Sequence, residues 1–94
     1  MDTLTPSNKQ LGQAVRRLRE ARRLSIEDLA GEAGIHPTYL SAIERGHRNP
    51  TWAKVCGLAE AFDITVCQLA HVAEAELYGA PYVPFSNPAP GKVA

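Results

Sequence analysis

Apolar side chains recur along this chain with the spacing of a helix. Leu11, Ala14, Val15 and Leu18 are three and four residues apart, which places them on one face of a helix. No segment shows the period-two alternation of a strand. Four later segments repeat the helical spacing, through Ile26, Leu29, Ala30 and Ala33; Leu40 and Ile43; Trp52, Val55, Leu58, Ala59 and Phe62; and Val66, Leu69, Ala70, Ala73 and Leu77. The pattern predicts an all-α fold of five helices, with Trp52 facing inward.

Capping residues predict where several of these helices begin. Ser25 can accept an amide hydrogen bond at the start of the second helix, and Asp28 completes a pattern that resembles a capping box. Pro37 suits the first position of the third helix, because its missing N–H would have no partner there. Thr51 and Thr65 can cap the fourth and fifth helices. Glycines end three of the helices, at Gly34, Gly46 and Gly79.

The chain of 94 residues is the right length for one small domain with a modest core. Residues 1–7 are expected to form a flexible arm, residues 8–78 the five-helix domain, and residues 79–94 a tail. The tail is rich in proline, at Pro81, Pro84, Pro88 and Pro90, and is expected to be extended or disordered.

Charge is distributed unevenly, although the net charge is zero. Residues 1–50 carry eight Lys or Arg and six Asp or Glu, a balance of +2, and residues 51–94 carry two and four, a balance of −2. Such a basic end can still bind phosphates. No apolar run is long enough to span a bilayer and no signal peptide is recognisable, so we expect a cytoplasmic protein without a membrane association.

The sequence lacks the residue arrangements that are typical of an enzyme active site. It has no nucleophile–base constellation and no glycine-rich phosphate loop after a strand. Cys56 and Cys67 are too few for a disulfide scaffold or a closed zinc site, and the histidines lack metal-ligand spacing. We therefore expect a protein that is not an enzyme and that has no cofactor and no metal.

The segment 26–45 has the size pattern of a helix-turn-helix. Ala30 is small where two helices must cross closely, Gly34 is in the turn, and Ile35 follows it and is expected to be buried. Leu40 and Ile43 fasten the third helix, at about residues 37–45, against the second. Its opposite face, made of Thr38, Ser41, Ala42 and Arg45, is expected to point outward and is slim enough to enter a major groove.

Residues 11–70 resemble the Cro/repressor-type (XRE) helix-turn-helix family of transcriptional regulators, a compact five-helix, lambda-repressor-like fold. The resemblance rests on the segments 15–19, 25–30, 34–35, 39–46, 48–51 and 58–62. The run Ile43-Glu44-Arg45-Gly46 through Asn49-Pro50 is its most distinctive part. One departure is Ile26, where the family usually has glutamine as a phosphate anchor.

The resemblance implies roles for individual residues. The base-reading candidates are Pro37, Thr38, Tyr39, Ser41 and Ala42, although Pro37 has no donor and can read only shape. Phosphate anchors are implied at Arg45, Asn49 and the backbone of the second helix at Ser25, and charge and position add Arg48. Arg19 and Glu44 are implied to form a structural ion pair between the first and third helices.

These features predict sequence-specific binding of double-stranded DNA by a small transcriptional regulator, expected to be a repressor. A homodimer on a palindromic operator is expected, since one such domain covers only a half-site. By resemblance, the fifth helix is the dimer surface, through Val66, Leu69, Ala70, Ala73 and Leu77. Two alternatives remain open: an antitoxin or adaptor whose protein partner binds the fifth helix or the tail, and a degenerate domain that has lost DNA binding.

Overall fold

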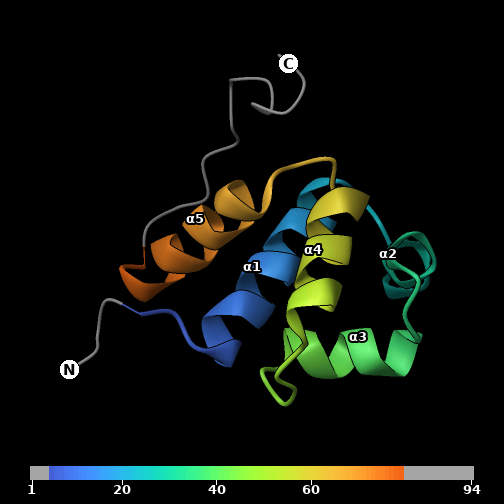
Figure 1. The fold of residues 1–94 in the computed structure, drawn as a ribbon, viewed down its shortest axis with the longest axis horizontal. Helices are drawn as coiled ribbons and strands as arrows, with labels where there is room; N and C mark the ends of the chain where they lie inside the picture. Colours follow the sequence, from blue (N-terminus) through green and yellow to red (C-terminus); the bar gives the residue numbers. More distant parts are fainter. Residues whose placement is uncertain (1–4, 80–94) are drawn as a thin grey trace.

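The computed structural model describes residues 5–79 and confirms the all-α prediction. The described chain folds into five helices, drawn in Figure 1: α1 (Asn8–Ala21), α2 (Ile26–Ala33), α3 (Pro37–Glu44), α4 (Trp52–Ala61) and α5 (Val66–Leu77). α1 runs through the middle and packs against both α5 and α3, while α2 packs against α3 and α4. The predicted tail lies outside the described residues apart from Gly79, as does the predicted arm apart from residues 5–7.

Local hydrogen bonds explain why the helices begin where they do. Ser25 and Asp28 form a complete capping box, in which the Ser25 hydroxyl accepts from the Asp28 amide at 3.0 Å. Thr51 and Thr65 cap α4 and α5 as predicted. Ser7, which the sequence analysis assigned to a flexible arm, is instead the N-cap of α1. These caps satisfy amides that would otherwise lack a partner in the first turn.

The two helices of the turn motif, α2 and α3, are each followed by a glycine in the left-handed backbone conformation. Gly34 has φ 72° at the end of α2, and Gly46 has φ 77° just after α3. Both conformations are strained for residues that carry a Cβ atom, which is why glycine stops these helices.

One core joins all five helices. It is built from small and branched aliphatic side chains around one aromatic ring: Ala14, Val15, Leu18, Leu29, Ala30, Leu40, Ile43, Leu58, Ala59, Phe62, Leu69, Val72 and Ala73. The apolar faces predicted from the spacing supply nearly all of these residues. Trp52 is an error in that prediction, because 69% of its surface is exposed. It is the first residue of α4 and lies beyond the part of the helix that joins the core cluster.

A close helix contact involves Gly12, in the first half of α1. A Cβ atom at this position would lie 2.2 Å from the carbonyl oxygen of Ile43 and 2.8 Å from that of Glu44. Only glycine therefore allows the backbone of α1 to approach the end of α3 this closely. This contact sets the position of α3 relative to the core.

No single helix among residues 5–79 is long and apolar enough to cross a membrane. Together α4 and α5 pass the same length and composition criteria, but they are bent by 97° at the break between them. Much of that apolar surface is the core of the domain.

Candidate nucleic-acid interface

The third helix is held at the edge of the domain, with one face on the core and one toward solvent. Leu40 and Ile43 are buried, as predicted. His36 caps the helix through its ring, where Nδ1 accepts from the Thr38 amide at 3.1 Å. Pro37 occupies the first helical position. The chain thus fixes both ends of α3 before any partner binds.

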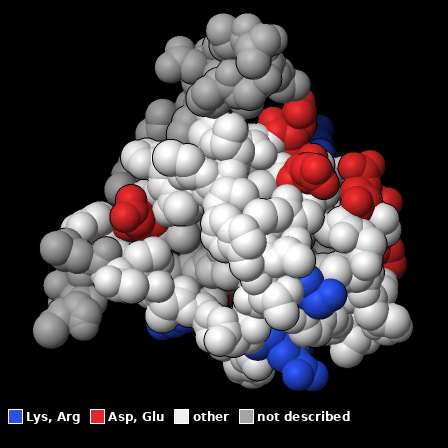
Figure 2. All heavy atoms as spheres, in the orientation of Figure 1, with Lys and Arg blue, Asp and Glu red and all other residues white. Residues whose placement is uncertain are grey.

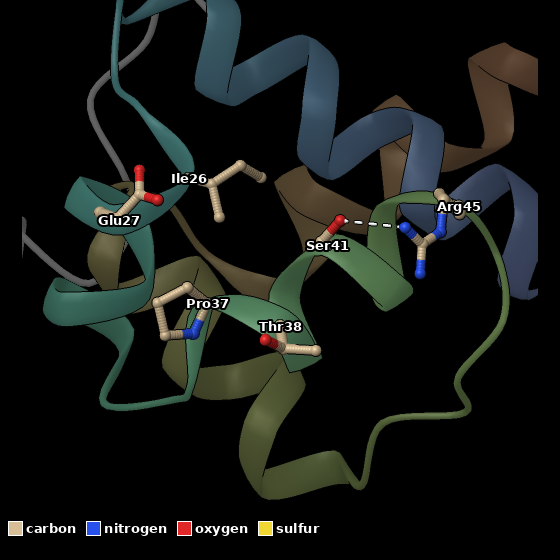
Figure 3. A pocket seen from close by; sticks show the side chains of 6 residues that line it. All are labelled: Ile26, Glu27, Pro37, Thr38, Ser41 and Arg45. Atoms are coloured by element: carbon tan, nitrogen blue, oxygen red, sulfur yellow. Dashed lines mark hydrogen bonds between the residues drawn. The ribbon is translucent and has the colours of Figure 1, made fainter.

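The outer face of α3 carries short polar side chains and one guanidinium group. Thr38 and Arg45 are exposed and Ser41 is half-buried. The Arg45 Nη1 donates to the Ser41 hydroxyl at 3.3 Å, so this guanidinium group bends back along the helix (Figure 3). Thr38, Ser41 and Arg45 therefore lie together on one surface, as the spacing predicted.

A hollow of about 340 Å³ lies between this face and the start of α2. Figure 3 shows the side chains that line it, which are Ile26, Glu27, Pro37, Thr38, Ser41 and Arg45. Ile26 is half-buried and packs against the core at its inner edge. In the sequence, Ile26 stands out only for the side-chain amide that it lacks. Its proximity to Pro37 became visible only with the packing of α2 against α3.

Two of the predicted base-reading residues are placed differently from the rest. Ala42 is buried, with 8% of its surface exposed, so the prediction that it faces outward is wrong. It lies on the side of α3 that turns toward the core with Ile43. Tyr39 is half-buried against the core and contributes its ring to the edge of the outer surface.

The Tyr39 ring is flanked by two cations. The guanidinium carbon of Arg48 lies 5.7 Å from the ring centroid, and the ammonium nitrogen of Lys54 lies 5.6 Å from it. Cation–π attraction draws both cations to the same ring. We call Arg48 and Lys54 the Tyr39 cation pair. Lys54 was not predicted from the sequence. It lies in the first turn of α4, and only the path of the α3–α4 loop brings that turn beside Tyr39.

The opposite end of the surface, at the start of α2, is acidic. Ser25 donates its amide to the Asp28 carboxylate at 3.1 Å, and Glu27 lies beside them in the same turn. Those hydrogen bonds lower the pKa of Asp28 below its ordinary value. A phosphate at Ser25 would therefore meet two carboxylates and, at Ile26, an apolar side chain.

Figure 2 shows the same asymmetry over one face of the molecule. Lys and Arg lie mainly along its lower edge, over α3 and the loop that follows, whereas Asp and Glu lie mainly toward α2 and the end of α4, with a smaller acidic area over α5. Arg48 and Asn49 are exposed in that loop. Within residues 5–79, no three His, Cys, Asp or Glu side chains gather in a way that could hold a metal ion.

The implied pair between Arg19 and Glu44 is present. Arg19 Nε donates to Glu44 Oε2 at 2.7 Å and Nη2 to Oε1 at 3.0 Å, while Nη1 donates to the Leu24 carbonyl at 2.9 Å. Only 14% of the Arg19 side chain and 6% of the Glu44 side chain are exposed. The hydrogen bond to Glu44 is the main cause of a raised Arg19 pKa. The pair links α1 to the end of α3 and is largely shielded from solvent. It is therefore suited to fixing the position of α3.

The predicted dimer residues lie partly in the core and partly along an open groove beside it. Leu69 and Ala73 are buried and complete the core, Val66 and Leu77 are half-buried, and Ala70 is exposed. A groove of about 200 Å³ nevertheless runs along this side of the domain, lined by Pro6, Ser7, Asn8, Leu11, Trp52, Val55, Val66, Leu69, Ala70 and Ala73. We call it the α4–α5 groove. Its most exposed large side chain is Trp52.

Comparison with known proteins agrees with this geometry. Residues 10–72 match a family model described as a helix-turn-helix domain. The HTH-type transcriptional regulator DdrOP3 of Deinococcus deserti is 40% identical over 70 residues, covering 74% of this chain and 53% of that protein. The chain thus matches about half the length of that relative.

Two solved structures have the same fold. The restriction-modification controller protein C.AhdI from Aeromonas hydrophila is 39% identical with a TM-score of 0.64, over 66% of this chain and 94% of that one. The C.Esp1396I controller tetramer, in complex with its 35 base-pair operator, has a TM-score of 0.70 at 21% identity, over 76% of this chain and 93% of that one. The chain therefore belongs to the helix-turn-helix family of Cro/repressor-type (XRE) transcriptional regulators.

Proposed function

We propose that this protein binds double-stranded DNA sequence-specifically through the outer face of α3 and acts in the cytoplasm as a small transcriptional repressor. The observation that carries the proposal is the placement of Thr38, Ser41 and Arg45 on one exposed face beside the Tyr39 cation pair. Hydroxyl and guanidinium groups can bond base edges in the major groove, while flanking cations bind phosphates. The names of its relatives favour this function over that of an adaptor.

Phosphate binding is expected to concentrate at one end of the surface. Arg48 and Lys54 are held beside Tyr39, and Asn49 is exposed in the same loop. The start of α2 offers backbone amides but also the carboxylates of Glu27 and Asp28. We therefore assign the main phosphate anchors to the α3–α4 loop and the first turn of α4, with Ser25 a weaker contact.

A homodimer would let two copies of α3 read a palindromic site. We place its interface at the α4–α5 groove, since an exposed tryptophan beside an apolar groove is typical of an interface centre. Trp52, Val66 and Ala70 are the side chains available for contact there, whereas Leu69 and Ala73 are already used by the core.

The test is selection from a random duplex library, followed by titration of the enriched duplex and of a scrambled duplex. The proposal predicts an enriched site with two-fold symmetry, bound by two chains. Enrichment of no sequence at moderate salt, with equal affinity for the scrambled duplex, would contradict it.

A further inference from the structure

The hollow between α2 and α3 has an apolar wall that faces the same side as the base-reading candidates. Ile26 and Pro37 make this wall, and Thr38 lines the hollow beside Pro37 (Figure 3). Neither Ile26 nor Pro37 has a side-chain donor or acceptor, and Pro37 also lacks the backbone N–H. This part of the surface can distinguish bases only by shape and by apolar contact.

The polar groups of the hollow argue against a phosphate as its occupant. Glu27 contributes a carboxylate that would repel a phosphate, and the Arg45 guanidinium is partly engaged by Ser41. A base edge presents no net charge and fits this mixed lining better. In the major groove, the apolar group that a base edge presents is the C5-methyl of thymine.

We propose that the Ile26–Pro37 wall is a reader of a pyrimidine C5-methyl group, so that each half-site of the operator carries a thymine at this position. The proposal rests on the proposed DNA-binding function and names the base feature that this site recognises. Ile26 is then a specificity-determining residue. Its apolar side chain contacts the methyl group of a base, whereas the glutamine usual in the family would anchor a phosphate. The same group exists in 5-methylcytosine, which the wall would accept in place of thymine.

The experiment uses the wild-type chain and the duplex enriched by selection. Each thymine in turn is replaced by deoxyuridine, which removes only the methyl group, and binding is measured by fluorescence anisotropy. Burial of one methyl group predicts a loss of about fourfold at one half-site and about fifteenfold when both half-sites are changed. Replacement of the same uracil by 5-methylcytosine, paired with guanine, tests whether the methyl alone restores part of the affinity.

Two variants link the effect to Ile26. Ile26→Ala is expected to lose most of the difference between the thymine and the deoxyuridine duplexes, because only Pro37 then remains of the wall. Ile64→Ala is the matched control, since Ile64 is also half-buried against the core but lies in the α4–α5 connection. It should keep the full sensitivity to deoxyuridine, and thermal melting of both variants reports whether they fold.

The outcomes separate this inference from the proposed function. A wild-type chain that selects a duplex but loses less than twofold affinity at every deoxyuridine position contradicts the inference and leaves DNA binding standing. A sensitive thymine that stays equally sensitive in Ile26→Ala contradicts it too, because another residue then reads the methyl. Failure to select any duplex contradicts the proposed function, and the inference falls with it.

Discussion

Arg19 on α1 and Glu44 at the end of α3 are joined by two hydrogen bonds of 2.7 and 3.0 Å, largely shielded from solvent. Removing either partner strands a partly buried charge, so Arg19→Ala and Glu44→Ala should each lower the free energy of unfolding by about 3 kcal/mol. The double variant should cost less than the sum of the two, because neither charge is then left unpaired. Urea denaturation of the four proteins measures the coupling, and strict additivity would contradict a direct pair.

Gly12 and Gly31 are both helical glycines and should respond to alanine in opposite ways. At Gly12 a Cβ atom would clash with the Ile43 carbonyl, so Gly12→Ala should lower stability by about 2–3 kcal/mol despite the better helix propensity. At Gly31 a Cβ atom meets nothing within 4 Å, so Gly31→Ala should raise stability by about 0.5–1 kcal/mol. Thermal melts of both variants test this, and a stabilised Gly12→Ala would show that α1 and α3 do not cross so closely.

Lys54, one of the two residues of the Tyr39 cation pair, should bind a DNA phosphate. Lys54→Ala and Arg48→Ala are each expected to weaken binding of all duplexes, and to reduce the slope of log K against log salt by about 1. Arg16→Gln is the control, because the exposed Arg16 is already paired with Glu20 on α1 at 3.0 Å. Anisotropy titrations at several salt concentrations give the slopes. An unchanged slope for Lys54→Ala would remove it from the interface.

The capping box of α2 predicts a pH dependence. Hydrogen bonds from Ser25 lower the pKa of Asp28, so its carboxylate stabilises the fold at pH values above the ordinary pKa of aspartate. That stabilisation is lost as the pH falls through the lower pKa of the folded state. NMR titration of the Asp28 carboxyl carbon should show the lowered pKa, and Ser25→Ala should return it toward its ordinary value. An ordinary pKa in the wild-type chain would mean that the box does not form in solution.

Trp52 is the only tryptophan and reports on the proposed dimer. The residue is 69% exposed in the single chain, so burial in a dimer should shift its fluorescence emission to shorter wavelength as concentration rises. Trp52→Ser should give a monomer by sedimentation and should change stability by only a few tenths of a kcal/mol, as is usual for exposed sites. Ala53→Ser is the control, since Ala53 is exposed on the same turn. A Trp52→Ser variant that remains dimeric places the interface elsewhere.

The sequence predicts the fold well because helix periodicity and caps are local signals. Ser25 with Asp28, Thr51, Thr65 and the glycine at 34 mark helix ends without reference to the rest of the chain. The error at Trp52 has the same origin. A residue at the first position of a helix can share the apolar spacing and still lie outside the core, as Trp52 does.

The surface of α3 was less predictable, because it depends on which neighbours the fold supplies. A helical wheel cannot decide whether Ala42, at the border between the two faces of α3, is buried, and the structure buries it. Lys54 joins the surface because the loop after α3 brings the first turn of α4 beside Tyr39, and Ile26 joins it through the packing of α2 against α3. Gly12 likewise carries no local signal of the close contact that it allows.

The outer face of α3 is proposed to read base sequence. The most direct measurement is the ratio of affinities for the enriched and the scrambled duplex, at one salt concentration, in the wild-type chain and in Thr38→Ala. We expect a high ratio in the wild type, and a ratio reduced about tenfold in Thr38→Ala with the affinity for scrambled DNA unchanged. A ratio near one in the wild type, or an equal ratio in both proteins, would contradict it.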